Sequence, residues 1–162
     1  MTLMIDTGVF YAFFDTKDIH YRDSTALLTH CLEGRFGQPF TTDYVVLETT
    51  VLTQRKLGAD VSLAFVNFLH ESGVRTIASG DEYYGRALES FHKNFPRLSL
   101  CDAATVVIMN ALGVQALASY DKRSFAGLVQ EVRGMDYFES LSREEQTSLK
   151  KKILMRQRDS GT

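Results

Sequence analysis

Short apolar runs alternate along the chain with longer stretches of helical periodicity. The short runs predict buried strands near residues 3–5, 40–42, 74–78, 114–119 and 129–132. Apolar positions spaced three and four residues apart predict helices over residues 18–32, 43–57, 60–73, 81–95 and 99–112. Strands that alternate with helices in this way favour right-handed crossovers, and therefore a parallel sheet with helices on both faces.

The residues between these elements predict where each one ends. The first strand runs into Asp6-Thr7-Gly8, which reads as a turn, and Asp18 is expected to cap the helix that follows. Pro96 ends the helix before it. In an open parallel sheet the ligand site lies beyond the carboxyl ends of the strands, so Asp6 is expected at that edge.

The C-terminal segment differs in character from the rest of the chain. Residues 142–158 follow a Ser-x-x-Glu capping pattern and predict a basic amphipathic helix. We therefore divide the chain into a core domain over residues 1–141 and an appended helix and tail over residues 142–162. No repeat or interdomain linker separates them, and 162 residues suit one buried core.

Composition narrows the class of protein. Charged residues make up 23% of the chain and no apolar run approaches the length of a membrane span, so neither a disordered nor a membrane protein is expected. The N-terminal segment is apolar but has no basic start, which argues against a signal peptide. We expect a cytoplasmic protein.

Charge and cysteine usage limit the partners and metals. The net charge of −2 divides into −5 over residues 1–142 and +3 over residues 143–162, and a slightly acidic total does not exclude a nucleic-acid substrate. Cys31 and Cys101 lie far apart without a CxxC pair, so both are expected to be reduced and packed. Any metal would then be held by oxygen ligands.

Four acidic residues stand out by their surroundings. Asp6 and Asp121 each follow a predicted strand, Glu48 has no basic side chain within one helical turn, and Asp102 opens a helix that is apolar on most sides. Each also has a simpler reading. Asp6 and Asp121 could be turn residues, Asp102 completes a capping box with Ser99, and Glu48 could lie on a helix that is apolar nearly all round.

Taken together, the four acids predict a cation site. Two carboxylates about 5 Å apart repel by roughly 3 kcal/mol at an effective dielectric near 20, and a cluster of four contains several such pairs. A bound Mg²⁺ or Mn²⁺ relieves this repulsion and prefers oxygen ligands.

Other motifs give weaker signals. The four histidines have no metal-ligand spacing, and no glycine-rich phosphate loop follows the first strand. The lysine run at residues 150–152 fits a solvated helix face as well as an RNA contact. Ser119 could hydrogen-bond an acid or a metal-bound water, or could simply end a strand.

These residues resemble the PIN-domain ribonucleases, and in particular the toxin component of VapBC-type toxin–antitoxin pairs. The resemblance spans most of the first 126 residues and is carried by four segments in order: LMIDTGVF with Asp6, TTDYVVLET with Glu48, LSLCDAATVVIM with Asp102, and ALASYDKRSF with Asp121. Ser119 matches the small hydroxyl residue that the family has before its last acid.

The resemblance implies a Rossmann-like three-layer α/β/α sandwich with a short parallel sheet of four to five strands. It implies an endoribonuclease that cleaves RNA with Mg²⁺ or Mn²⁺, in which Asp6 and Asp102 are the main ligands and Glu48 and Asp121 act directly or through metal-bound water. Thr7 and Ser119 would support them. An antitoxin partner and a homodimer are further implied, and the candidate RNA contacts are Arg22, Arg55, Lys56 and Lys122.

Three competing functions are weighed against this one. A haloacid-dehalogenase-type phosphatase needs a second acid at position 8, which is glycine, and a receiver domain needs paired early acids and a late lysine. A catalytically silent module that binds RNA or protein through the same fold is the remaining alternative.

Overall fold

The computed structural model describes the backbone of residues 2–159 and the side chains of residues 2–155. Five short strands form one parallel sheet in the order β3-β2-β1-β4-β5. The strands are β1 (Leu3–Ile5), β2 (Phe40–Thr42), β3 (Arg75–Ile77), β4 (Ala116–Ser119) and β5 (Glu131–Gly134). The parallel sheet expected from the sequence is confirmed.

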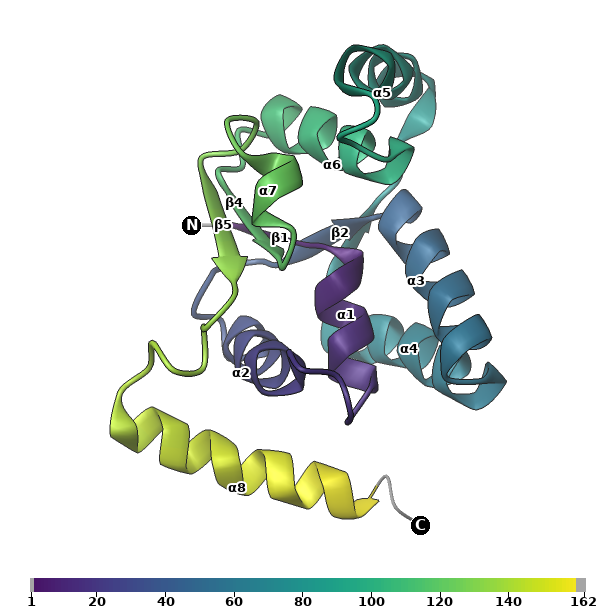
Figure 1. Ribbon diagram of the computed structural model, residues 1–162. Coiled ribbons are helices and arrows are strands. Elements are labelled where there is room, and N and C mark those ends of the chain that lie inside the picture. The colour runs from purple at the N-terminus through teal and green to yellow at the C-terminus, as the bar shows by residue number, and fades with distance from the viewer. Residues whose placement is uncertain (1, 160–162) are drawn as a thin grey trace.

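Helices cover both faces of this sheet (Figure 1). The helices are α1 (Thr7–Phe14), α2 (Tyr21–Leu32), α3 (Asp43–Lys56), α4 (Ala59–Ser72), α5 (Gly80–Asn94), α6 (Leu100–Ala111), α7 (Lys122–Phe125) and α8 (Arg143–Asp159). Figure 1 shows α1, α2 and α4 on one side, α6 and α7 on the other, and α8 outside α2. The three-layer α/β/α sandwich is therefore confirmed.

The strand order places a crevice beside the central strand. β1 pairs with β2 on one side and with β4 on the other, in the register Leu3↔Ala116 to Ile5↔Ala118. The chain reverses its direction of travel across the sheet between β1 and β4, and ligand sites in such sheets lie at this switch point. Asp6 directly follows β1, and Ser119 is the last residue of β4, so both lie at this switch point.

Helix α1 was not expected from the sequence. Instead of a turn, the chain enters a helix at once, and Asp6 caps it by accepting a hydrogen bond from the Thr7 N–H at 2.8 Å. The helix reads TGVFYAFF, which is apolar on most sides and shows little periodicity because it is buried against the core. Phe10, for example, packs on Phe65 of α4 with ring centroids 5.2 Å apart.

Other boundaries differ from the prediction by a few residues. Helix α2 begins at Tyr21 rather than at Asp18, whose carboxylate accepts from the His20 N–H at 2.7 Å and so holds the preceding turn. Strand β5 lies two residues later than expected, and the short helix α7 was not predicted. Thr42 caps α3.

Helix α8 packs on α2, as Figure 1 shows. A separate apolar cluster joins them, in which Leu149 and Ile153 meet Tyr21, Ala26 and Phe138. The predicted capping box forms, because the Ser142 N–H donates to Glu145 and the Glu145 N–H donates to the Ser142 hydroxyl. The division at residue 142 remains a prediction.

Two further expectations bear on the class of protein. Cys31 and Cys101 are both buried and unpaired, as predicted. Within the described part of the chain, no helix has the length and apolar character needed to cross a membrane. The cytoplasmic location remains a prediction.

Candidate active site

The four predicted acids lie at the carboxyl end of the sheet, on different elements. Asp6 follows β1, Glu48 lies in the second turn of α3, Asp102 is in the first turn of α6, and Asp121 caps α7 just beyond β4. Only Asp6 is buried; Asp102 is half-buried, and Glu48 and Asp121 are exposed. The acids therefore line an open edge of the sheet around one buried member.

Asp6 sits at the centre of this arrangement. Its side chain accepts a hydrogen bond from the Thr7 N–H at 2.8 Å and one from the Ser119 hydroxyl at 2.7 Å. Burial nevertheless raises the pKa of Asp6 from 3.8 to about 7, and the charges of Asp102 and Glu48 add to this rise against the effect of the hydrogen bonds. The folded chain thus holds a carboxylate that lacks a compensating positive charge.

Ser119 joins two of the acids. Its hydroxyl donates to Asp6 and accepts from the Asp121 N–H at 3.1 Å. Asp121 in turn accepts from the Ser124 N–H at 2.9 Å, which fixes it as the cap of α7. The strand-end hydroxyl therefore hydrogen-bonds a neighbouring acid, which is one of the roles weighed for it, and its part in catalysis remains a prediction.

Glu48 is tied to the site through Thr7, the other predicted supporting residue. The Thr7 hydroxyl donates to the Glu48 carboxylate at 2.5 Å and so connects α1 to α3. Buried Cys101 lies on the same side, since its pKa is raised by burial first and by the charge of Glu48 second. Glu48 thus faces the pocket edge despite its apolar neighbours.

Asp102 forms the capping box weighed for it, and its role as a metal ligand remains a prediction. Its carboxylate accepts from the Ser99 N–H at 2.8 Å, and the Ser99 hydroxyl accepts from the Asp102 N–H at 3.0 Å, so the capping box is real. Burial raises its pKa, and the charges of Glu48 and Asp121 raise it further despite the hydrogen bonds from Ser99. The four acids are therefore electrostatically coupled across three helices and a strand.

The residues that hold Ser119 and Asp121 in place carry no signal in the sequence. The ring of Tyr120 stacks on His20 at 4.0 Å between centroids, and its hydroxyl bonds to Ser24 at 2.6 Å. A Cβ at Gly134 would meet the Ser119 carbonyl oxygen at 2.5 Å, so only glycine fits beside β4 there. No local pattern marks these contacts, because each joins residues distant in sequence.

The predicted RNA-contact residues are exposed and lie at the margins. Arg55 and Lys56 end α3 and line a groove of about 450 Å³ that also includes Glu48. Lys122 follows Asp121, and Arg22 lies on α2 toward α8. Their contact with RNA remains a prediction.

The donor chemistry suits a hard cation, although the arrangement is not a closed ligand shell. Carboxylate and hydroxyl oxygens are what Mg²⁺ and Mn²⁺ prefer. Over the residues that the structure describes, however, no three acidic, histidine or cysteine side chains are grouped so that they could hold a metal ion as they lie. The carboxylates interact electrostatically, but their side chains do not converge on one point.

Comparison with known proteins identifies the family. A protein of Archaeoglobus fulgidus named VapC ribonuclease is 38% identical over 152 residues, which cover 90% of each chain. The chain belongs to the VapC family of PIN-domain ribonucleases. The resemblance seen in the sequence is therefore confirmed, although no family model matches the chain.

Two more distant proteins with the VapC name are also similar to this chain. Ribonuclease VapC26 of Mycobacterium tuberculosis is 24% identical over 127 residues, which cover 78% of this chain and 91% of that protein. The crystal structure of VapC20 of the same organism, described as a sarcin–ricin loop cleaving toxin, superposes with a TM-score of 0.69. That match is 20% identical and covers 79% of this chain and 97% of that one, so it supports the fold alone.

Proposed function

We propose that this chain is an Mg²⁺- or Mn²⁺-dependent endoribonuclease and the toxin of a toxin–antitoxin pair. The observation that carries the proposal is Asp6, a buried carboxylate at the switch point of the sheet whose pKa is raised to about 7 by burial and by neighbouring acids. Such a group is costly unless a cation joins it. Membership of the VapC family supports the reaction class.

Two of the acids would hold the metal ion, and two hydroxyl residues orient acidic side chains. Asp6 and Asp102 would hold the ion, which when bound makes hydroxide available near neutral pH and offsets charge on the phosphodiester. Ser119 orients the Asp6 carboxylate, and Thr7 orients Glu48. The Cys101 thiol also lies within hydrogen-bond reach of the Glu48 carboxylate. Because Glu48 is exposed at the edge of the site, its carboxylate would accept a proton from the attacking water.

A groove next to the acids supports a protein partner. Leu47 and Val51 of α3 are 65% and 46% exposed, and they line the same groove as Glu48. Exposed apolar residues beside a catalytic edge suit a docking segment that shields the site. We infer that an antitoxin covers this groove.

The nuclease assignment is tested by cleavage of a mixed RNA pool. We expect wild-type protein to cleave RNA with Mn²⁺ and to stop in EDTA, and Asp6→Asn to lose about 10³-fold in rate because several kcal/mol of transition-state stabilisation depend on the ion. Asp60→Asn, an exposed acid in the first turn of α4, is the matched control and should retain full activity. Equal cleavage by Asp6→Asn would mean contamination, and metal-independent binding without cleavage would favour the silent module.

The homodimer is part of the same proposal. Light scattering of the purified protein on a sizing column would give its mass, and a mass of 18.3 kDa would mean a monomer.

A further inference from the structure

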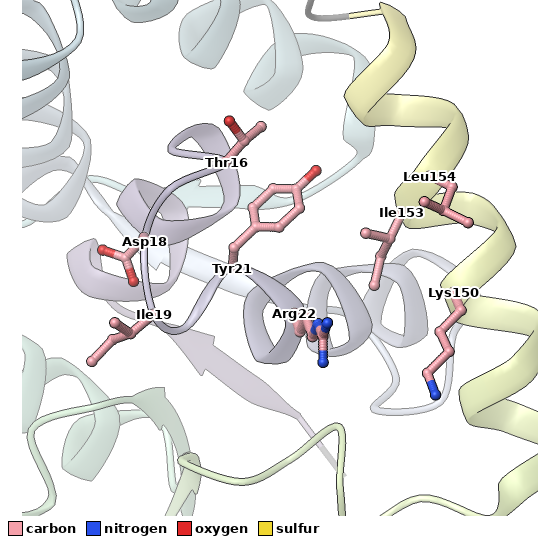
Figure 2. Close-up of a pocket in the computed structure, with 8 residues that line it drawn as sticks. All are labelled: Thr16, Asp18, Ile19, Tyr21, Arg22, Lys150, Ile153 and Leu154. Carbon is pink, nitrogen blue, oxygen red and sulfur yellow. The ribbon is translucent and has the colours of Figure 1, made fainter.

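We propose that the cavity between α8 and the start of α2 binds a nucleotide unit of the RNA substrate, at a distance from the bond that is cut. The inference rests on the proposed nuclease function and adds a substrate contact to it. The cavity has a volume of about 530 Å³. Figure 2 shows its two walls: Thr16, Tyr21 and Arg22 come from the α1–α2 turn and α2, and Lys150, Ile153 and Leu154 come from α8.

Two cations line this cavity without an acidic partner. Among the described residues, neither Arg22 nor Lys150 forms an ion pair, whereas nearby Lys152 pairs with Glu33 at 2.6 Å and Arg35 pairs with Glu145. The Lys150 ammonium group lies over the ring face of Phe138, 5.9 Å from the ring centroid. Two unpaired cations on facing walls of one cavity suit an anion such as an RNA phosphate.

The acid in the cavity has another task. Asp18 accepts a hydrogen bond from the His20 N–H at 2.7 Å and so holds the α1–α2 turn. Figure 2 shows it at the end of the cavity away from Lys150. A phosphate is therefore expected on the side of Lys150 and Arg22.

The remaining lining suits a base. Ile153, Leu154 and the 89%-exposed Ile19 provide apolar surface, and apolar side chains of this kind are costly to leave in water without a partner. The Tyr21 hydroxyl forms no hydrogen bond in the described structure, but it is buried and is not presented to a ligand. A base in this cavity would therefore be held by apolar contact.

The cavity also reaches the margin of the active site. Asp18 and Ile19 immediately precede His20, whose ring stacks on Tyr120, and Tyr120 lies between Ser119 and Asp121. Helix α1 separates Asp6 from this turn by about 12 Å of helical rise. A strand of RNA held at the acids can therefore continue into the cavity.

The test compares two adjacent lysines on α8. Lys150→Gln and Lys151→Gln remove the same charge from exposed positions, but only Lys150 lines the cavity. Binding of a fluorescent single-stranded RNA of mixed sequence to the full chain in EDTA would be followed by anisotropy over a range of salt concentrations. We expect Lys150→Gln to raise the dissociation constant about tenfold and to reduce the salt slope by about 0.7, the value for one lost phosphate contact.

The control decides the outcome. Lys151→Gln should bind RNA as the wild type does, and Arg22→Gln should repeat the loss seen with Lys150→Gln. Equal effects of Lys150→Gln and Lys151→Gln, or none from either Lys150→Gln or Arg22→Gln, would overturn the proposal. If the wild type binds RNA through these residues but never cleaves it with Mn²⁺, the nuclease proposal fails while the binding site stands.

Discussion

Asp6 at the carboxyl end of the sheet and Glu145 in the first turn of α8 have opposite surroundings. Asp6 is bonded by a hydroxyl and a backbone N–H, and its pKa is raised to about 7, first by burial. Glu145 is bonded by Arg35 and Ser142, and the hydrogen bond from Arg35 is the first cause that lowers its pKa to about 2. Glu145 therefore has a positively charged partner, whereas Asp6 has none among the described residues, so the sheet edge is where a cation is needed.

The largest expected effect comes from removing the charge of Asp6. Because its folded pKa is raised above 3.8, the folded chain in EDTA should lose stability as pH rises from 3.8 to about 7. Asp6→Asn should abolish this decline and be more stable than wild type at pH 8, by at most about 4 kcal/mol. Thermal unfolding against pH measures both effects.

If the stability of the wild type and of Asp6→Asn depended on pH in the same way, the charge of Asp6 would not destabilise the folded chain. Asp60→Asn, on exposed α4 surface, should leave the profile unchanged and so controls for the loss of one acid.

A smaller effect is expected at Ser119. Ser119→Ala removes the donor to Asp6 and the acceptor of the Asp121 N–H, so the pKa of Asp6 should rise further. We expect activity with Mn²⁺ to fall about 10- to 100-fold, as for other residues that orient metal ligands. Ser119→Thr keeps the hydroxyl and should retain most of the activity; equal loss in both variants would indicate a packing defect.

The smallest effect is expected at the ion pair of α8. Arg35→Gln leaves the exposed Glu145 without its main partner, yet such surface pairs contribute little to stability. The melting temperature should fall only slightly, and activity should not change. A large loss of activity would mean that α8 supports the catalytic edge directly.

The sequence indicated the acids and two hydroxyl residues beside them, but not the contacts that join them. Asp6 and Asp121 could be placed because a strand end is a local pattern, and Glu48 because its helical neighbours carry no positive charge. Helix α1 was missed because burial on most sides removes the periodicity that marks a helix. The bond from Ser119 to Asp6 joins residues 113 positions apart, which no local pattern encodes.

The distances between the four carboxylates could not be predicted from the sequence either. Repulsion among four carboxylates predicts a cation, but not how far apart the side chains lie without one. The structure keeps Asp102 in a capping box with Ser99 and Glu48 on Thr7, so local hydrogen bonds compete with convergence on one centre.

Binding of Mn²⁺ to the purified protein at pH 8 tests the central claim most directly. Calorimetric titration of the wild type should show saturable binding at the sheet edge, and Asp6→Asn should show little or none while remaining folded. If the wild type binds no Mn²⁺, or if Asp6→Asn binds it equally well, the acids at this edge do not form a cation site.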